Sequence, residues 1–159
     1  MGNKFLIKLK KEEKLELIEP SEEICESYTE KSANCLKSAK LLLANSLFEN
    51  SVGMAYYAMY DLLIGLLFKA GIKCENHSGS ILLLKVIFNQ NGLFKTISDA
   101  KKERIDSQYY VTADEITKES TRELLGIAED FILKMTLFIK NLNNEDIEKA
   151  RKELTMLTQ

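Results

Sequence analysis

Proline, histidine, tryptophan and cysteine are scarce or missing in this chain of 159 residues. It has one proline and no tryptophan. Because proline removes an amide donor and clashes with the preceding turn, its scarcity leaves long helices uninterrupted. The three cysteines, Cys25, Cys35 and Cys74, are odd in number and lack C-x-x-C spacing. This pattern predicts reduced thiols that pack as small apolar side chains, and argues against a disulfide framework or a zinc site.

Long apolar runs and a strong excess of either charge are also missing. The longest strongly apolar run, residues 62–68, is far shorter than the ~20 residues that span a bilayer. Residues 1–9 lack the apolar region and cleavage site of a signal peptide. We therefore expect a cytoplasmic protein with no membrane contact. The net charge of −2 excludes a surface that is basic all over, but it allows a local basic patch.

Motifs for metals and cofactors are absent from the sequence. No Glu-x-x-His pair occurs, and the adjacent acidic pairs Glu12/Glu13 and Glu22/Glu23 lie in charged segments. There is no glycine-rich phosphate loop, which argues against a P-loop nucleotide hydrolase. We expect no metal site and no cofactor.

Helical periodicity dominates the chain after residue 20, and no alternating strand pattern of any length occurs there. Apolar or small residues recur at helical spacing over residues 21–45 and 50–70. Because short loops join the expected helices, these should pack as antiparallel neighbours, and the pattern predicts an all-α fold with a short extra C-terminal helix. The remaining helix starts are predicted at Ser78 or Ser80, at Thr96 or Ser98, at a capping box formed by Thr112 and Glu115, and at Asn144.

Three parts of the chain differ in composition. Residues 1–20 form a charged arm whose alternating Phe5, Ile7 and Leu9 suit a short helix, a strand or a frayed tail. Residues 21–142 form the expected bundle. Residues 143–159 form the C-terminal helix, which we expect to pack on the bundle or extend it.

An ordered set of short motifs gives a more specific indication. The motifs are Ala55-Tyr56-Tyr57-Ala58-Met59-Tyr60, His77-Ser78-Gly79, Arg104-Ile-Asp-Ser-Gln-Tyr109-Tyr110 and Ala128-Glu129-Asp130-Phe131. Each motif is weak alone, but together, over roughly residues 25–140, they resemble the HEPN domain in its subgroup of small stand-alone prokaryotic proteins.

The resemblance implies an antiparallel up-and-down bundle of four to five main helices that commonly forms a homodimer. Many members of the family are metal-independent ribonucleases, often the toxin of a pair whose antitoxin is a minimal nucleotidyltransferase; others are non-catalytic binding modules. Catalytic members carry an arginine, usually followed by a polar residue, and a histidine four to six residues after the arginine. The two motifs of a dimer meet in a cleft where RNA is cut through its own 2′-hydroxyl. Here Ile105 follows Arg104, and Tyr109 and Tyr110 occupy the histidine's window.

Arg104 is the first candidate site residue, because a guanidinium can hold a phosphate through two parallel hydrogen bonds. The only histidine, His77, lies 27 residues earlier. It can serve as the acid–base group if the fold brings it near Arg104, or it can play a structural role in its loop. Tyr109 is the third catalytic candidate, although a phenol with a pKa of about 10 is a poor base at neutral pH.

Tyrosines complete the expected nucleotide- or RNA-binding set. Tyr109 and Tyr110 can stack on a base or bind a phosphate, or they can pack in the core. Tyr56, Tyr57 and Tyr60 lie on different faces of one helix, so at least one of them should line a groove or an interface. We assign Tyr57 to the binding set with Arg104, Tyr109 and Tyr110.

Two functions remain open at this point. The first is a HEPN-type component of a toxin–antitoxin or defence system that binds RNA or nucleotide and cleaves RNA without a metal. The second is a non-catalytic nucleotide- or protein-binding module that partners a minimal nucleotidyltransferase, which would modify Tyr109. The missing histidine favours the second function, whereas Arg104 favours a polar site in both.

Overall fold

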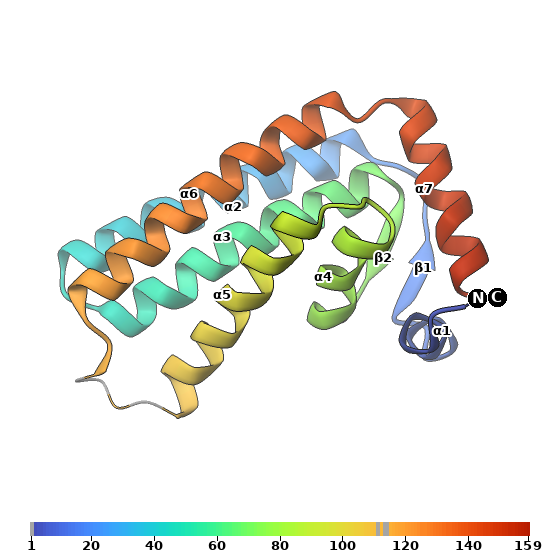
Figure 1. Cartoon of the computed structure of the whole chain (residues 1–159). Coiled ribbons are helices and arrows are strands. Elements are labelled where there is room, and N and C mark those ends of the chain that lie inside the picture. The colour runs from blue at the N-terminus through green and yellow to red at the C-terminus, as the bar shows by residue number, and fades with distance from the viewer. Residues whose placement is uncertain (1, 111, 113–114) are drawn as a thin grey trace.

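Helices make up most of the residues that the computed structural model describes, which are 2–110, 112 and 115–159. Figure 1 shows them packed as a bundle, which confirms the predicted all-α class. The elements are α1 (Lys4–Lys11), β1 (Leu15–Leu17), α2 (Glu22–Ala44), α3 (Phe48–Lys69), β2 (Ile72–Cys74), α4 (His77–Val86), α5 (Asn91–Tyr109), α6 (Lys118–Asn141) and α7 (Asn144–Leu157).

Helices α2 and α3 form a long antiparallel hairpin whose contact surface is lined by small residues. The buried hydroxyls of Ser32 and Ser51 donate across the hairpin to the carbonyl oxygens of Ala58 and Ala39, at 2.6 and 2.7 Å. A β-carbon at Gly65 would lie 3.3 Å from the backbone of α2. Small side chains therefore let the two backbones approach closely, and the two serines satisfy their own polar groups inside the contact.

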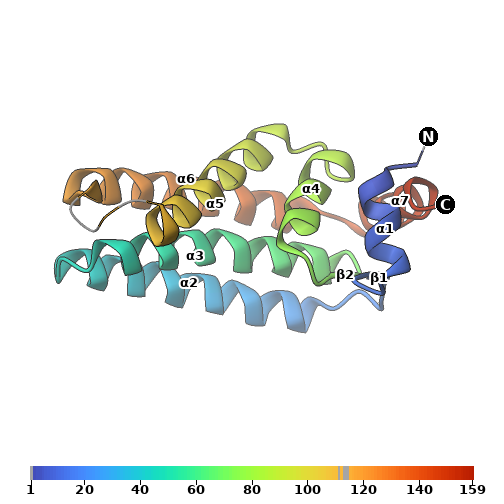
Figure 2. The same cartoon turned by 90° about the horizontal axis from the view of Figure 1, so that it is seen from below.

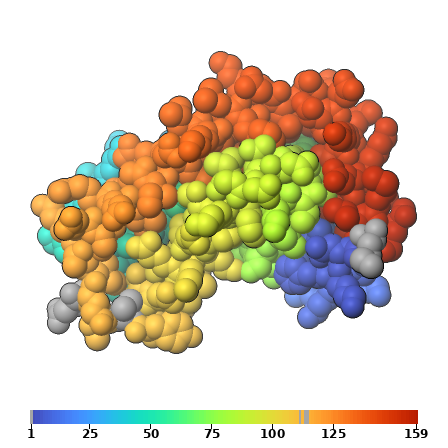
Figure 3. Space-filling model, viewed as in Figure 1, coloured from blue at the N-terminus to red at the C-terminus, as the bar shows by residue number. Residues whose placement is uncertain are grey.

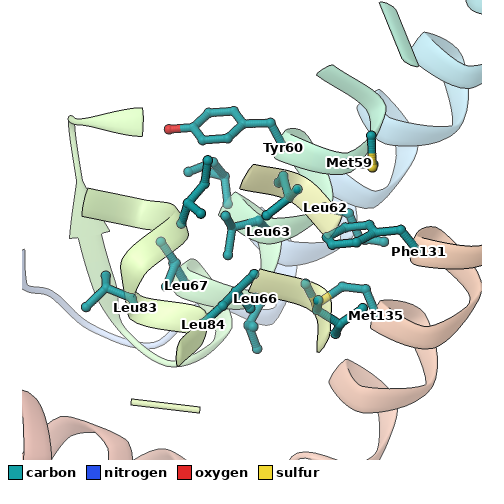
Figure 4. Close-up of a cluster of buried hydrophobic side chains, with 14 of the residues drawn as sticks. Met59, Tyr60, Leu62, Leu63, Leu66, Leu67, Leu83, Leu84, Phe131 and Met135 are labelled. Atoms are coloured by element: carbon teal, nitrogen blue, oxygen red, sulfur yellow. The ribbon is translucent and has the colours of Figure 1, made fainter. Parts of the chain in front are cut away.

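Helix α3 is the central helix, as its wide apolar surface predicts. Its leucines lie between α4 on one side and α6 on the other (Figure 4). By length and composition α3 could span a membrane, but 78% of its most apolar stretch is buried inside the bundle. The labelled residues of this cluster are Met59, Tyr60, Leu62, Leu63, Leu66 and Leu67 of α3, Leu83 and Leu84 of α4, and Phe131 and Met135 of α6.

The two ends of the chain meet at one end of the bundle, where α1, β1 and α7 gather (Figure 3). The Asn3 amide donates to the Leu157 carbonyl at 2.9 Å. Strands β1 and β2 pair antiparallel, with Glu16 opposite Lys73. Of the three possibilities for the N-terminal arm, the chain adopts a helix followed by a short strand. Strand β2 was not predicted, because three residues are too few to display an alternating pattern.

The predicted starts of α4 and α5 are both wrong. Helix α4 begins at His77, and the Asn76 side chain caps it by accepting the Gly79 amide at 2.8 Å. Helix α5 begins at Asn91, well before Thr96 or Ser98, without a side-chain cap. Several residues in each loop can accept an amide hydrogen bond, and the apolar period does not choose among them.

The start of α6 is also later than predicted. The Glu115 carboxylate accepts the Thr112 amide at 2.7 Å, but this turn precedes the helix, and Ala113 and Asp114 within it lie outside the described residues. Thr117 caps α6 by accepting the Ser120 amide at 3.0 Å. In α7 the cap is one residue earlier than expected, at Asn143 instead of Asn144.

Candidate functional site

The tyrosines of α3 form the base of a polar cluster on the side of the helix that faces α4 and α5. Tyr56 and Tyr60 are one turn apart and stack on each other, with ring centroids 5.9 Å apart. Both rings are buried, whereas Tyr57, on the next face, is only partly buried. Tyr57 is thus the tyrosine of α3 that reaches the surface at a groove, as the helical phase predicted for at least one of the three.

His77 lies against these tyrosines because it is the first residue of α4. Its ring stacks on Tyr60 with centroids 4.0 Å apart, and its Nδ1 atom is 3.0 Å from the Tyr56 hydroxyl oxygen. Burial lowers the pKa of His77 below its usual 6.5, and the nearby positive charges of Arg104 and Lys101 lower it further. Both effects favour the neutral form of His77.

Arg104 approaches the same tyrosines from α5. Its guanidinium carbon lies 5.0 Å from the centre of the Tyr56 ring and 5.5 Å from that of Tyr57, which is cation–π geometry. Its Nη1 atom donates to the Tyr57 hydroxyl at 3.4 Å and to the Gln108 side-chain oxygen at 3.2 Å.

The Arg104 charge has no acidic partner in the described part of the chain. No carboxylate there lies within ion-pair distance of it. Its Nε atom is buried without a hydrogen-bond partner among the described residues. Because no described carboxylate neutralises the guanidinium charge, Arg104 is suited to take an anionic ligand.

Lys101 adds a third basic group to the cluster. It lies one turn before Arg104 on α5, and its ammonium donates to the Ser78 hydroxyl in the first turn of α4. Burial lowers the pKa of Lys101, and repulsion from Arg104 adds to this. Arg104 thus lowers the pKa values of both Lys101 and His77, as expected of a positive site that an anion would stabilise. Lys101 was not among the candidates selected from sequence, although its spacing of three from Arg104 places both on one helix face.

Tyr109 and Tyr110 lie outside this cluster. Their side chains are 73% and 79% exposed at the end of α5, so neither packs in the core. No described stacking or hydrogen bond joins them to His77 or Arg104. Of the residues selected from sequence, the fold brings together Arg104, His77 and Tyr57, and both the histidine and the arginine contact Tyr56.

The donor chemistry of the cluster suits a phosphate. Arg104 and Lys101 supply charged N–H donors, and neutral His77 supplies a group that can accept a proton near neutral pH. In the described part of the chain, no three His, Cys, Asp or Glu side chains are grouped so as to hold a metal ion.

The fold and the cluster define a helical-bundle protein with a basic, tyrosine-lined site between α3, α4 and α5. Residues 25–141 match the HEPN domain family. Because this match covers most of the chain and includes every residue of the cluster, the protein belongs to the HEPN domain family.

Relatives of known sequence come from archaea and bacteria. A Methanocaldococcus jannaschii protein, named as a candidate toxin, is 26% identical over 110 residues, which are 67% of this chain and 82% of that protein. A Thermotoga maritima protein of the UPF0332 group is 27% identical over 126 residues, covering 76% of this chain and 95% of the relative. A UPF0332 protein from Pyrococcus horikoshii is 32% identical over 89 residues, covering 56% of this chain and 63% of the relative.

Proposed function

We propose that the protein is a HEPN-type toxin that binds RNA at the Arg104 cluster and cleaves it without a metal. The observation that carries this proposal is that His77 and Arg104 both contact Tyr56, the histidine at its hydroxyl and the arginine over its ring. We assign to His77 of α4 the acid–base role of the histidine that the Arg-x4-Tyr-Tyr sequence lacks. The name of the Methanocaldococcus relative supports the toxin assignment. We further propose that the protein acts as a homodimer, as the family resemblance implies.

The chemistry proposed for each residue follows from its contacts. If the Nδ1–H of His77 donates to the Tyr56 hydroxyl, the Nε2 lone pair is available as a base. Burial raises the pKa of Tyr56, so its phenol stays neutral and can accept that hydrogen bond. Tyr56 is then a positioning residue that selects the reactive tautomer of the histidine.

RNA is the only reactant in the proposed cleavage. His77 takes the 2′-hydroxyl proton, the 2′-oxygen forms a bond to phosphorus, and the bond from phosphorus to the 5′-oxygen breaks. The Lys101 ammonium supplies the proton that the leaving 5′-oxygen takes up. Arg104 stabilises the negative charge on the pentavalent phosphorus. The products are a 2′,3′-cyclic phosphate and a free 5′-hydroxyl.

The test is RNA cleavage by the purified protein in excess EDTA. Arg104→Ala and His77→Ala should each reduce the rate by about 100-fold or more, a typical loss for one oxyanion-stabilising or acid–base group. Arg122→Ala is the matched control, because Arg122 is an exposed arginine on α6 outside the cluster. No cleavage by the folded parent, or equal cleavage by all four proteins, would rule out the ribonuclease.

A second function is favoured by the exposure of Tyr109. Its hydroxyl is accessible to another enzyme, which fits a non-catalytic module whose tyrosine is modified by a minimal nucleotidyltransferase. Incubation with such an enzyme and a nucleoside triphosphate should then add a nucleotide to the parent but not to Tyr109→Phe. Modification of both proteins, or of neither, would exclude this role for Tyr109.

A further inference from the structure

A groove of about 510 Å³ crosses the first half of α3 beside the Arg104 cluster. One wall comes from the C-terminal part of α2, where Leu41 lies, and the opposite wall includes Gln108 near the end of α5. Figure 2 shows the last turns of α5 lying close to the first half of α3. The groove thus joins three elements at the end of the bundle that is remote from the chain termini.

The groove and the cluster share two residues. Tyr57 and Gln108 line the groove, and both accept hydrogen bonds from the Arg104 guanidinium. The Arg104 side chain therefore lies at the end of the groove. For a nucleotide whose phosphate binds Arg104, the groove is the adjoining surface on which its base can rest.

The lining of the groove suits a nucleobase, which has two apolar faces and a polar edge. Leu41 is 58% exposed, and with Tyr57 it offers apolar and aromatic surface for stacking. Glu49, Asn50 and Gln108 place a carboxylate and two amide groups around this surface. These groups accept and donate hydrogen bonds, as readout of a base edge requires.

Gly53, which is itself buried, lies in the lining of the groove. A β-carbon built on Gly53 would meet no atom of another element within 4 Å, so no packing contact requires glycine there. Glycine is unfavourable in the middle of a helix, which makes its presence at an uncrowded position noteworthy. Its effect is to leave room above the helix for a flat group.

We propose that this groove is a nucleobase-binding subsite that seats a base of the RNA whose phosphate Arg104 binds. The inference rests on the proposed phosphate binding by Arg104. It also names the ligand class more closely, because only an unpaired base can enter such a groove, so the RNA bound here is single-stranded.

The experiment compares two labelled chains of equal length: a short single-stranded RNA and the same ribose-phosphate chain without bases. Binding of both is measured by fluorescence anisotropy in EDTA. The parent should bind the RNA about tenfold more tightly than the abasic chain, the size expected from one stacked base. Gly53→Leu should remove this preference by filling the groove, and Gly53→Ala should reduce it. Gly126→Leu on α6 is the control for placing leucine in a helix, because the β-carbon there would also meet nothing, although Gly126 is exposed and Gly53 is buried.

The outcomes separate this inference from the proposed function. Arg104→Ala should weaken binding of both chains, whereas Gly53→Leu should weaken only that of the RNA. If the parent binds both chains equally, phosphate binding stands and the base subsite is wrong. If Gly53→Leu keeps the preference, or changes only the oligomeric state, the groove does not hold a base. If the parent binds neither chain, both the proposed function and the subsite fail.

Discussion

At the scale of single residues, His77 reports on the electrostatics of the whole cluster. Burial lowers its pKa first, and the charges of Arg104 and Lys101 lower it further. We expect Arg104→Ala to raise the pKa of His77 toward 6.5, because one of the repelling charges is gone. As the chain has one histidine, its ring proton signal can be followed by NMR titration without assignment. Arg122→Ala should leave the titration unchanged, and an unchanged value in Arg104→Ala would show that the two side chains do not interact.

The same pKa shift makes stability depend on pH in a defined direction. The folded state holds its histidine proton less tightly than the unfolded chain, whose histidine pKa is about 6.5. As the pH falls through 6.5, the unfolded chain gains protons first, so His77 lowers the free energy of unfolding until the folded pKa is reached. This contribution disappears above 6.5. Carboxylates also change stability over this pH range. The difference in the free energy of unfolding between the parent and His77→Gln, measured from pH 7 to pH 5, isolates the contribution of His77.

Among the secondary-structure elements, the contact between α2 and α3 depends on Gly65. A β-carbon there would lie 3.3 Å from both the Cys25 carbonyl oxygen and the Tyr28 side chain. We expect Gly65→Leu to force the two helices apart and to lower the free energy of unfolding by about 1–3 kcal/mol. Chemical denaturation measures this change. Gly126→Leu should be neutral or slightly stabilising, because leucine favours a helix more than glycine does and meets no neighbour at that position. Equal effects of the two substitutions would show that the contact tolerates a larger residue.

The long helices could be predicted from sequence because their apolar period runs over 20 residues or more. Helix α3 combines a wide apolar surface with few charges, and it is the central helix. Starts of short helices could not be placed to the residue, since Asn76, Ser78 and Ser80 all have capping side chains within one turn. Strand β2 depends on pairing with β1, more than fifty residues away in the sequence, and such pairing leaves no local signal.

The candidate site could be predicted only in part, for a similar reason. Motif order identified Arg104 and His77 as candidates. Their approach through the Tyr56 ring depends on how α3, α4 and α5 pack, which the sequence pattern does not specify. The groove beside Gly53 was missed because no sequence pattern indicates an empty space. The one sign of it is a glycine inside a helix that no packing contact requires.

At the scale of the whole molecule, Arg151 ties the two ends of the chain to the bundle. From α7 it donates to the carbonyl oxygens of Ile18, which follows β1, and Gly71, which precedes β2, each at 2.6 Å. Gly71 has a φ of +70°, and a β-carbon there would lie 2.6 Å from the Ile18 carbonyl oxygen. Only glycine therefore lets the two loops and the guanidinium meet at this point.

We expect Arg151→Ala to lower the free energy of unfolding by about 2–4 kcal/mol, because it removes two charge-assisted hydrogen bonds and takes away the donor to the Ile18 carbonyl oxygen, whereas the Gly71 carbonyl oxygen still accepts the Ile18 amide. Lys149→Ala, an exposed position on the same helix, is the control and should change stability by less than about 0.5 kcal/mol. Hydrogen exchange of the backbone amides then shows which parts of the chain lose stability. Faster exchange confined to α1, β1, β2 and α7 would show that Arg151 holds the chain ends on an independently stable bundle. Faster exchange throughout α2, α3 and α6 would show instead that the ends and the bundle unfold as one unit. A stability equal to that of Lys149→Ala would contradict the structural role assigned to Arg151.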